Sequence, residues 1–383
     1  MALPLLPGGG SQVWETQVAI LESLIHHLSP ADPDNAHTLP ASLYTDPDIL
    51  HLEYQSIFEN TWQLVGHQDQ VRNVGDQLVC QVGRVPIVVV KNTQQEIKAF
   101  HNVCRHRAGP VAIKNSNDKV LRCKYHGWTY TLDGDLKSAP EMNSTPNFDV
   151  CQYHLPKAKI EVWQGFLFVC INDSPAPLET VLAGIKDTIL PIDLNRFSFS
   201  HRDEYLIDCN WKVYMDNYLE GYHLPHVHPG LSKLLDYRSY DTILHEWHSY
   251  QFSPLDNPNN DENNFYGDGK AHYYCVYPNL MLNILPGRLQ TNVILPQGIN
   301  KTRIYFDYYY DNMGSPETDA LIKKDSEFSD EIQEEDILIC EQVQKGLGSG
   351  SYKAGRLCMK REAGVLHYQN LIRQSLKQAL EAS

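Results

Sequence analysis

The pattern of apolar and polar positions divides the chain into a strand-rich first half and a mixed second half. Between Leu64 and Asp173, short runs of β-branched and aromatic residues alternate with turns built from Gly, Asn and Asp. The clearest of these runs are QLVCQV, PIVVV, IKAFHNV and GFLFVCI. This alternation predicts a small antiparallel β-domain.

Helical periodicity is expected on the N-terminal side of this β-domain. Apolar residues recur near helical spacing from Val18 to Leu28 and again from Asp46 to Trp62. The Pro- and Asp-rich loop SPADPDNAHTLP lies between these two stretches. We interpret residues 1–42 as an N-terminal leader with one helix, and residues 43–173 as the first domain.

Residues 174–383 form the predicted second domain, and their pattern is mixed. The tyrosine-rich runs HYYCVYPNLMLNIL and TRIYFDYYYD favour strands. Helical periodicity fits four other stretches, which are 179–189, Asn210–His223, Ser315–Gly346 and 364–383. The chain is therefore predicted to be an α+β protein with a domain boundary between Asp173 and Leu178.

Charge and composition exclude several classes of function. The 383 residues carry 32 basic and 47 acidic side chains, a formal net charge of −15, so a nucleic-acid partner is not expected. No apolar run reaches the roughly 18 to 20 residues of a membrane-spanning helix, and the N-terminus lacks the pattern of a targeting peptide. We expect a cytoplasmic protein without a membrane partner. Its nine scattered cysteines are then buried apolar residues or metal ligands.

Two cysteines and two histidines in the β-domain form the first candidate metal site, in the order Cys104-x-His106 and Cys123-x-x-His126. Zinc fingers usually place their cysteines on one element and their histidines on another. One residue of each kind on each loop suits a [2Fe–2S] cluster, with two thiolates on one iron and two imidazoles on the other. Gly127 and Trp128 would supply a turn and an apolar cover, and Pro140 a third loop.

A second candidate site lies in NWKVYMDNYLEGYHLPHVHPGL, residues 210–231. Helical residues three or four apart share a face, so Asp216, Glu220 and His223 are expected together. Two prolines interrupt the helical pattern after that point, so His228 would lie in a loop that can return to His223. Two histidines and one carboxylate on one side of an iron leave positions open for O2 and substrate.

The carboxylate ligand must come from another segment. The stretch EEDILICEQVQKGLGSGSYKAGR offers Glu334, Glu335 and Asp336 in one predicted helix. Spacing alone does not choose among them, and an acidic run is usually a solvated helix face.

Both motifs resemble one protein family. CRHRAGP…CKYHGWTY resembles the Rieske signature in the form found in ring-hydroxylating and related oxygenases, and DNYLEGYHLPHVH resembles the mononuclear-iron motif of Rieske oxygenase α-subunits. The resemblance extends from LPASLYTDPDIL to the C-terminal helix. It implies a Rieske [2Fe–2S] antiparallel β-domain at 43–173, followed at 174–383 by a helix-grip, START-like catalytic domain that is built on an antiparallel sheet and holds a mononuclear Fe(II).

The resemblance also implies roles for individual residues. The implied ligands of the mononuclear iron are His223, His228 and Asp336. Glu220 stands where the family has an acidic residue, commonly Asp, that bridges to the Rieske histidine of a neighbouring subunit. Glutamate is one methylene longer, and a subset of the family uses it here. Asp216 and Asn217 of the same motif are further candidate catalytic residues.

Several stretches resemble the branch of the family that acts on quaternary ammonium compounds of the choline, betaine or carnitine type, although this chain has LHYQNL where those relatives have a histidine-rich tail. Aromatic faces hold such cations, but tyrosines in strands mostly pack within sheets. The alternative is an aromatic ring-hydroxylating dioxygenase or aromatic acid demethylase, in which Arg288 or Arg303 would hold a carboxylate. The candidate cage residues are Tyr205, Tyr214, Tyr218, Tyr222, Tyr273, Tyr274, Tyr277, Tyr308, Tyr309 and Tyr310.

The expected enzyme needs electrons from outside the chain. The sequence has neither a GxGxxG motif after a strand nor the cysteine run of a plant-type ferredoxin. NAD(P)H can therefore act only indirectly, through a separate reductase with or without a ferredoxin. The resemblance also implies a homotrimer. Two other classes of function remain possible. One is a pure electron carrier, and the other is a binding module that is stabilised by zinc and has no catalytic activity.

Overall fold

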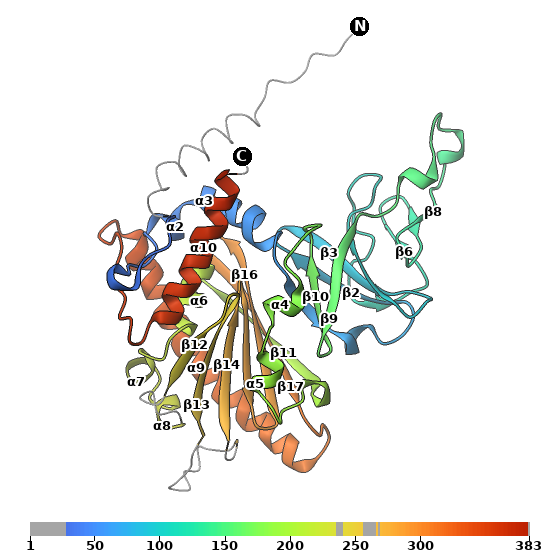
Figure 1. Cartoon of the computed structure of the whole chain (residues 1–383). Coiled ribbons are helices and arrows are strands. Elements are labelled where there is room, and N and C mark those ends of the chain that lie inside the picture. Colours follow the sequence, from blue (N-terminus) through green and yellow to red (C-terminus); the bar gives the residue numbers. More distant parts are fainter. Residues whose placement is uncertain (1–27, 235–239, 256–265, 267–268, 382–383) are drawn as a thin grey trace.

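The computed structural model describes residues 28–234, 240–255, 266 and 269–381 (Figure 1). A seven-stranded antiparallel sheet forms the first half, in the strand order β1-β10-β9-β4-β3-β2-β5, and a three-stranded sheet of order β6-β7-β8 lies at its outer end. The strands are β1 (Gln63–His67), β2 (Asp76–Val82), β3 (Val85–Lys91), β4 (Ile97–His101), β5 (Ser116–Asn117), β6 (Leu121–Arg122), β7 (Thr129–Tyr130), β8 (Leu136–Ser138), β9 (Lys157–Trp163) and β10 (Phe166–Cys170).

A second seven-stranded antiparallel sheet forms the scaffold of the other half, in the order β11-β17-β16-β15-β14-β13-β12. Its strands are β11 (Ser198–Ile207), β12 (Asp241–Leu244), β13 (His248–Pro254), β14 (Lys270–Val276), β15 (Leu280–Leu285), β16 (Arg288–Gly298) and β17 (Lys301–Tyr310). The predicted strand runs at residues 272–285 and 302–311 are confirmed as β14, β15 and β17. The apolar side chains of residues 43–58 pack in the core of this half. His51 and Tyr54 of this segment also contact Arg84, which lies between β2 and β3 of the first sheet.

Helices cover the second sheet and carry the residues of interest. The long helix α9 crosses it, with α6 and α10 nearby (Figure 1). The helices are α2 (Ser42–Thr45), α3 (Pro47–Glu53), α4 (Leu178–Val181), α5 (Ile185–Thr188), α6 (Trp211–Tyr218), α7 (Leu224–Val227), α8 (Leu231–Leu234), α9 (Pro316–Gly348) and α10 (Ala363–Glu381), together with short turns η2 (Pro33–Asn35), η3 (Tyr54–Phe58), η4 (Gln68–Val71), η5 (Met142–Ser144), η6 (Val150–Gln152) and η7 (Leu194–Arg196). Both predicted C-terminal helices are confirmed. The helix expected at Val18–Leu28 lies outside the described residues, apart from Leu28.

Two predicted helices are wrong in their extent. The helix expected at Asp46–Trp62 begins with Asp46 as its N-cap, but it passes into the π-helical turn η3 and ends at Phe58. The side chain of Thr61 bonds to the Ile57 carbonyl group at 2.8 Å and closes this end. The helix expected at 179–189 is broken into α4 and α5, because Gly184 takes a left-handed backbone with φ of 78°.

One apolar cluster joins the two halves. Trp62, Leu64 and Phe166 of the first sheet pack with Tyr250 and Tyr274 of the second sheet in the same buried cluster. The expected boundaries at 42/43 and 173/174 remain a prediction. Within the part of the chain that the structure describes, no helix is long and apolar enough to cross a membrane.

Candidate active site

The first site lies in two loops at the outer end of the β-domain. Cys104 and His106 follow β4, and Cys123 and His126 lie between β6 and β7. The two cysteines are buried, at 3% and 2% exposure, whereas both histidines are exposed. The Tyr130 hydroxyl group lies 3.3 Å from Cys104 Sγ. Each loop thus turns its cysteine inward and its histidine outward.

The spacing of these four side chains distinguishes a cluster from a zinc ion. The rings of His106 and His126 lie 4.6 Å apart between centroids, and Cys104 lies next to Cys123. Four ligands of one zinc ion would lie roughly 3–4 Å from one another. Yet among the described residues, no three of these cysteine and histidine side chains bring their ligand atoms within 4.8 Å of one another. A pair of thiols set apart from a pair of imidazoles fits a [2Fe–2S] cluster.

The surroundings of the cysteines also suit a cluster. A Cβ atom on Gly109 would lie 3.0 Å from Cys123 Sγ, so the chain can approach the thiol closely here because the residue is glycine. Burial raises the pKa of the Cys123 thiol, so ionisation needs a nearby cation such as iron. Trp128 stacks on His106 at 4.9 Å between centroids, and Pro140 packs against Gly127. These contacts match the expected apolar cover and third loop.

The helix predicted at Asn210–His223 is shorter than expected, and the reasoning from a shared helix face is wrong. Asn210 caps α6, which ends at Tyr218. Glu220 and His223 lie beyond it, in a turn where the Glu220 carboxylate accepts hydrogen bonds from the backbone N–H groups of Tyr222 and His223. This carboxylate satisfies backbone donors that a longer helix would have used. Glu220 and His223 therefore meet through a turn.

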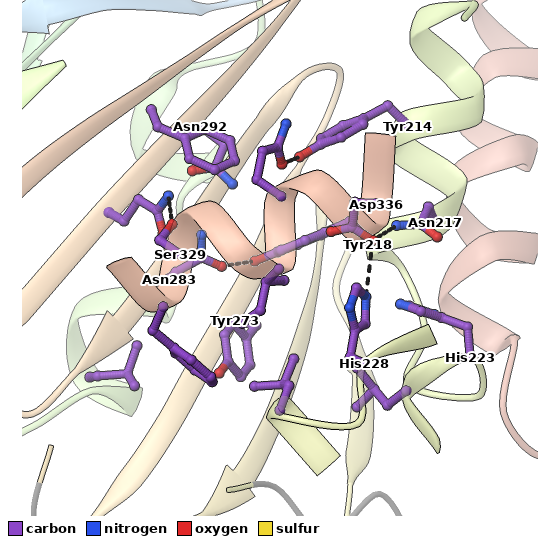
Figure 2. A pocket seen from close by; sticks show the side chains of 18 of the residues that line it. Tyr214, Asn217, Tyr218, His223, His228, Tyr273, Asn283, Asn292, Ser329 and Asp336 are labelled. Atoms are coloured by element: carbon purple, nitrogen blue, oxygen red, sulfur yellow. Dashed lines mark hydrogen bonds and ion pairs between the residues drawn. The ribbon is translucent and has the colours of Figure 1, made fainter. Parts of the chain in front are cut away.

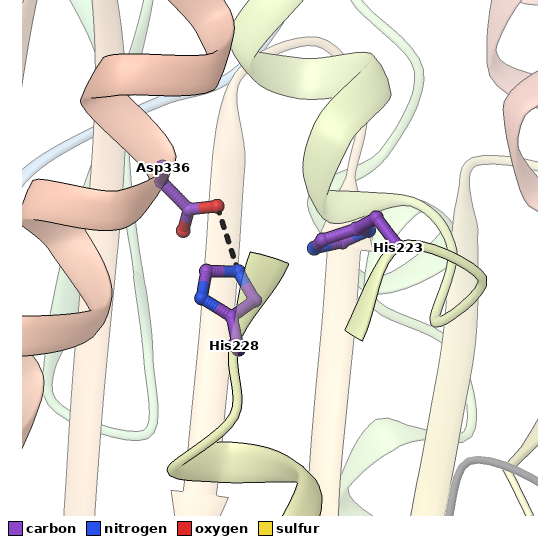
Figure 3. A group of neighbouring side chains, drawn as sticks. All are labelled: His223, His228 and Asp336. Atoms are coloured by element: carbon purple, nitrogen blue, oxygen red, sulfur yellow. Dashed lines mark hydrogen bonds and ion pairs between the residues drawn. The ribbon is translucent and has the colours of Figure 1, made fainter. Parts of the chain in front are cut away.

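Three side chains from two segments converge beside α6 (Figure 3). His223 precedes α7, His228 follows it, and Asp336 lies on α9. One ligand atom from each of these residues lies within 4.8 Å of the others. His228 Nε2 is 3.0 Å from Asp336 Oδ1, and the two imidazole rings are 5.1 Å apart between centroids. This set of two imidazoles and one carboxylate is a suitable donor set for Fe(II).

Each histidine of the triad has an outer partner that fixes its orientation. Glu220 Oε1 lies 2.7 Å from His223 Nδ1, and Glu335 Oε2 lies 2.7 Å from His228 Nδ1. Carboxylates that bind Nδ1 in this way leave Nε2 of each ring for a metal ion. Glu335, which the sequence left as a candidate ligand, therefore contacts the side of His228 away from Asp336.

The charges around His228 favour a cation. Burial lowers the pKa of His228, but Asp336 and Glu335 outweigh burial and raise it above its ordinary value. Asn217 Nδ2 donates a hydrogen bond of 2.6 Å to Asp336 Oδ1, which orients that carboxylate. The residues present thus fit a divalent iron.

Asp216 points away from the triad. Its Oδ2 accepts hydrogen bonds from the Tyr44 hydroxyl group at 2.6 Å and from Gln369 Nε2 at 3.0 Å. Burial raises the pKa of this carboxyl group to about 6. Asp216 therefore ties α6 to the N-terminal segment and to α10, and the structure does not bring it to the three candidate ligands.

A cavity opens beside the triad (Figure 2). Of the two arginines proposed as carboxylate binders, Arg288 lines the cavity, whereas Arg303 pairs with Glu204 on the outer side of the sheet. Only three of the candidate cage tyrosines line it, which are Tyr214, Tyr218 and Tyr273. Sequence reasoning missed four other aromatic lining residues, Tyr240, Tyr266, Phe306 and Phe328, because no local pattern reports which sheet face a cavity occupies.

Comparisons with known proteins agree with this geometry. The family model of the Rieske [2Fe-2S] domain matches residues 61–149, and that of the ring-hydroxylating alpha subunit catalytic domain matches residues 194–378. Choline monooxygenase, chloroplastic, from Arabidopsis thaliana is 34% identical over 94% of this chain and 88% of its own. The chain belongs to the Rieske non-haem iron oxygenases. It is an oxidoreductase with a Rieske [2Fe–2S] cluster and a mononuclear iron, and it uses O2 and a small-molecule substrate.

Two further relatives lie in the same part of this oxygenase family. The carnitine monooxygenase oxygenase subunit of Escherichia coli strain K12 is 29% identical over 91% of this chain and 96% of its own. The crystal structure of a quaternary ammonium Rieske monooxygenase in complex with L-carnitine superposes with a TM-score of 0.79 at 25% identity, covering 91% of this chain and 97% of that one. The predicted α+β fold with Rieske and catalytic domains is thereby confirmed.

Proposed function

We propose that this oxygenase hydroxylates a small quaternary ammonium compound of the choline, betaine or carnitine type at an iron held by His223, His228 and Asp336. The observation that carries the proposal is the triad at the wall of an aromatic-lined cavity. The names of the relatives support the substrate class, because they are choline and carnitine monooxygenases. They favour this function over that of an aromatic dioxygenase.

The proposed reaction inserts one oxygen atom into a C–H bond. The substrate R–H, O2, two electrons and two protons give R–OH and water. The bound iron supplies the O2 chemistry. The protein holds the substrate cation against aromatic faces and excludes water from the cavity. A hydroxylated carbinol carbon would give an aldehyde hydrate, and a hydroxylated N-methyl group would give an unstable hemiaminal.

A comparison of binding tests the substrate class directly. We expect the holoenzyme, without O2, to bind choline about tenfold more tightly than 3,3-dimethylbutan-1-ol, the neutral compound of the same shape. The reason is the attraction of a desolvated cation to aromatic faces, worth about 1–2 kcal/mol. Isothermal titration calorimetry measures both affinities. Equal affinities, or binding of aromatic acids alone, would overturn the proposed substrate class.

We further propose that electrons arrive from a separate reductase and cross between subunits of a homotrimer. The loops with His106 and His126 lie at the far end of the β-domain from α6 and α7, so the two sites of one chain are well separated (Figure 1). Both histidines are exposed, as an electron donor to a neighbouring subunit must be. Glu220 lines the main cavity and also a second cavity, whose walls include residues of α6 and α9. Val343, which is 44% exposed, lines this second cavity as well.

Glu220→Gln tests the route of the electron. Glu220 contacts His223 Nδ1 at 2.7 Å and is the proposed bridge to the neighbouring cluster. We expect the variant to keep both metals but to slow cluster oxidation by about 10- to 100-fold. The measurement is stopped-flow absorbance of the reduced, substrate-bound enzyme mixed with O2.

The matched control is Glu335→Gln, which removes the corresponding contact of 2.7 Å from His228. We expect that variant, too, to keep its iron in buffer that contains Fe(II), but without slowing electron transfer. Loss of the mononuclear iron from Glu220→Gln but not from Glu335→Gln would instead make Glu220 a ligand. Equal electron-transfer rates in both variants would contradict the proposed role of Glu220 as the bridge between subunits.

A further inference from the structure

A polar ladder joins the second sheet to α9 along one wall of the cavity. On β16, Arg288, Gln290 and Asn292 occupy alternate positions and so share one face of the sheet. On α9, Asp325, Ser329 and Gln333 are four residues apart and share one face of the helix. All three β16 residues line the cavity, as do Ser329 and Gln333.

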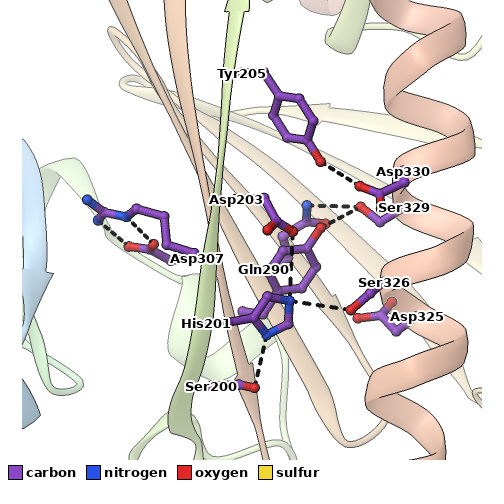
Figure 4. Close-up of polar contacts among 12 residues, drawn as sticks. Ser200, His201, Asp203, Tyr205, Gln290, Asp307, Asp325, Ser326, Ser329 and Asp330 are labelled. Atoms are coloured by element: carbon purple, nitrogen blue, oxygen red, sulfur yellow. Dashed lines mark hydrogen bonds and ion pairs between the residues drawn. The ribbon is translucent and has the colours of Figure 1, made fainter.

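Each rung of this ladder is a pair of one β16 residue and one α9 residue. In the first two rungs, hydrogen bonds join the pair, and a tyrosine hydroxyl group from β17 bonds to it as well. Arg288 Nε donates to Asp325 Oδ2 at 2.9 Å, and the Tyr310 hydroxyl group donates to the same oxygen at 2.6 Å. Gln290 Nε2 donates to Ser329 Oγ at 3.3 Å (Figure 4). The Tyr308 hydroxyl group donates to Ser329 Oγ at 2.8 Å.

In the third rung, which consists of Asn292 and Gln333, one polar group of each side chain is unpaired. Asn292 and Gln333 are 4% and 1% exposed, yet Asn292 Oδ1 and Gln333 Nε2 have no hydrogen-bond partner in the part of the chain that the structure describes. The β17 residue in register with Asn292 is Phe306, which has no hydroxyl group. A buried acceptor and a buried donor without partners each cost roughly 1–3 kcal/mol. The rung therefore lacks one group that both donates and accepts.

The third rung lies close to the iron triad. Gln333 precedes Asp336 by three residues, less than one turn of α9. The Tyr214 hydroxyl group of α6 donates to Gln333 Oε1 at 2.6 Å, and Asn217 of the same helix donates to Asp336. Asn292 lines the cavity across from the two histidines (Figure 2).

We propose that Asn292 and Gln333 bind a hydroxyl group of the substrate, which takes the place of the tyrosine hydroxyl group that Phe306 lacks. This proposal rests on the proposed function and narrows it to quaternary ammonium alcohols. The hydroxyl group donates to Asn292 Oδ1 and accepts from Gln333 Nε2. Because Gln333 lies within one turn of Asp336 on α9, the end of the substrate that bears the hydroxyl group would lie on the same wall of the cavity as Asp336.

The same wall is a poor site for a carboxylate. Arg288 is the only lysine or arginine among the described lining residues, and its charge is balanced by Asp325, which is fully buried. Its Nη2 also donates to Gln290 Oε1 at 2.6 Å. A substrate carboxylate at this arginine would lie close to a second buried carboxylate, which is unfavourable. Asn292 Oδ1 would repel it as well.

The test compares choline with n-propyltrimethylammonium, in which a methyl group replaces the hydroxyl group. Calorimetry without O2 on the holoenzyme should show choline binding about tenfold more tightly. In Asn292→Leu and in Gln333→Met, the affinities for the two compounds should become about equal. The affinity for the propyl compound should stay within about twofold of the wild-type value. Gln290→Met is the control, because both polar groups of Gln290 are already bonded within the ladder; there the ratio should persist.

Phe306→Tyr provides an independent test by adding the missing hydroxyl group within the protein. We expect this variant to melt at a higher temperature than the wild type and to bind choline at least about fivefold more weakly. The proposal would be overturned if Asn292→Leu and Gln333→Met still bound choline about tenfold more tightly than n-propyltrimethylammonium. It would also be overturned if the wild type bound these two compounds equally, or if it bound carnitine or glycine betaine more tightly than choline. None of these results would contradict a quaternary ammonium substrate. Equal binding of choline and 3,3-dimethylbutan-1-ol would instead contradict a quaternary ammonium substrate altogether.

Discussion

Asp336→Ala is expected to abolish turnover while the Rieske absorption spectrum survives. The variant removes the one carboxylate of the proposed iron triad, which lies 3.0 Å from His228 Nε2 and accepts the hydrogen bond from Asn217. Loss of the metal removes several kcal/mol of stabilisation from the reaction, so activity should fall at least about a thousandfold. Product formation, iron content and visible absorption of the same preparation measure the effect. His223→Ala should behave in the same way.

Glu334→Ala is the matched control on the same acidic run. Glu334 is exposed, whereas Asp336 faces the two histidines. We expect the control to keep its iron and wild-type activity. Retained turnover in Asp336→Ala protein that lacks the mononuclear iron would refute the assigned site. Loss of the cluster spectrum in that variant would show that the two sites are not independent.

Lys212→Met is expected to lower the free energy of unfolding by about 3–5 kcal/mol. Lys212 Nζ and Glu53 Oε1 form an ion pair at 2.5 Å, and both side chains are fully buried. Burial lowers the pKa of Lys212 and raises that of Glu53, and each charge opposes the effect of burial on the other. Among the described residues, removal of the lysine leaves this buried carboxylate with the Trp211 indole as its one remaining donor, at 2.7 Å. Urea denaturation monitored by circular dichroism measures the loss.

The double variant Glu53→Gln/Lys212→Met separates the ion pair from packing. The glutamine keeps an acceptor for Trp211 but carries no charge, so we expect the double variant to be more stable than Lys212→Met alone. Additive losses in the two single variants would show that the charges do not interact. A loss below about 1 kcal/mol in Lys212→Met would show that this pair does not anchor the N-terminal segment.

Local patterns were sufficient for β2, β3, β4, β10, β14, β15 and β17 and for the residue types at both candidate metal sites, whereas β11, β13 and β16 were not among the predicted runs. The alternation in QLVCQV and PIVVV became β2 and β3, and the loop positions of the cysteines and histidines followed from their spacing. Local patterns failed where side chains compete with the backbone. The Glu220 carboxylate accepts backbone hydrogen bonds beyond Tyr218, and Gly184 breaks a helix that apolar spacing favours.

Choices between neighbouring residues needed the tertiary structure. Glu335 and Asp336 are adjacent in an acidic run, and only the approach of His228 separates them, since its Nδ1 contacts Glu335 and its Nε2 contacts Asp336. The unpaired groups of the third rung could not be predicted from the sequence either. Asn292 and Gln333 lie 41 positions apart in the sequence, and the significance of Phe306 appears only when it is in register beside Asn292.

A single turnover in ¹⁸O2 would show directly whether the enzyme hydroxylates a quaternary ammonium substrate. The holoenzyme is reduced chemically without air, mixed with choline, carnitine, glycine betaine or a simple aromatic acid, and exposed to ¹⁸O2, and the products are identified by mass. We expect the wild type to oxidise a trimethylammonium substrate, with one labelled oxygen atom in the hydroxylated product before it exchanges with water, and Asp336→Ala to give no product. A hydroxylated aromatic acid as the only product, or equal product from Asp336→Ala, would contradict this expectation.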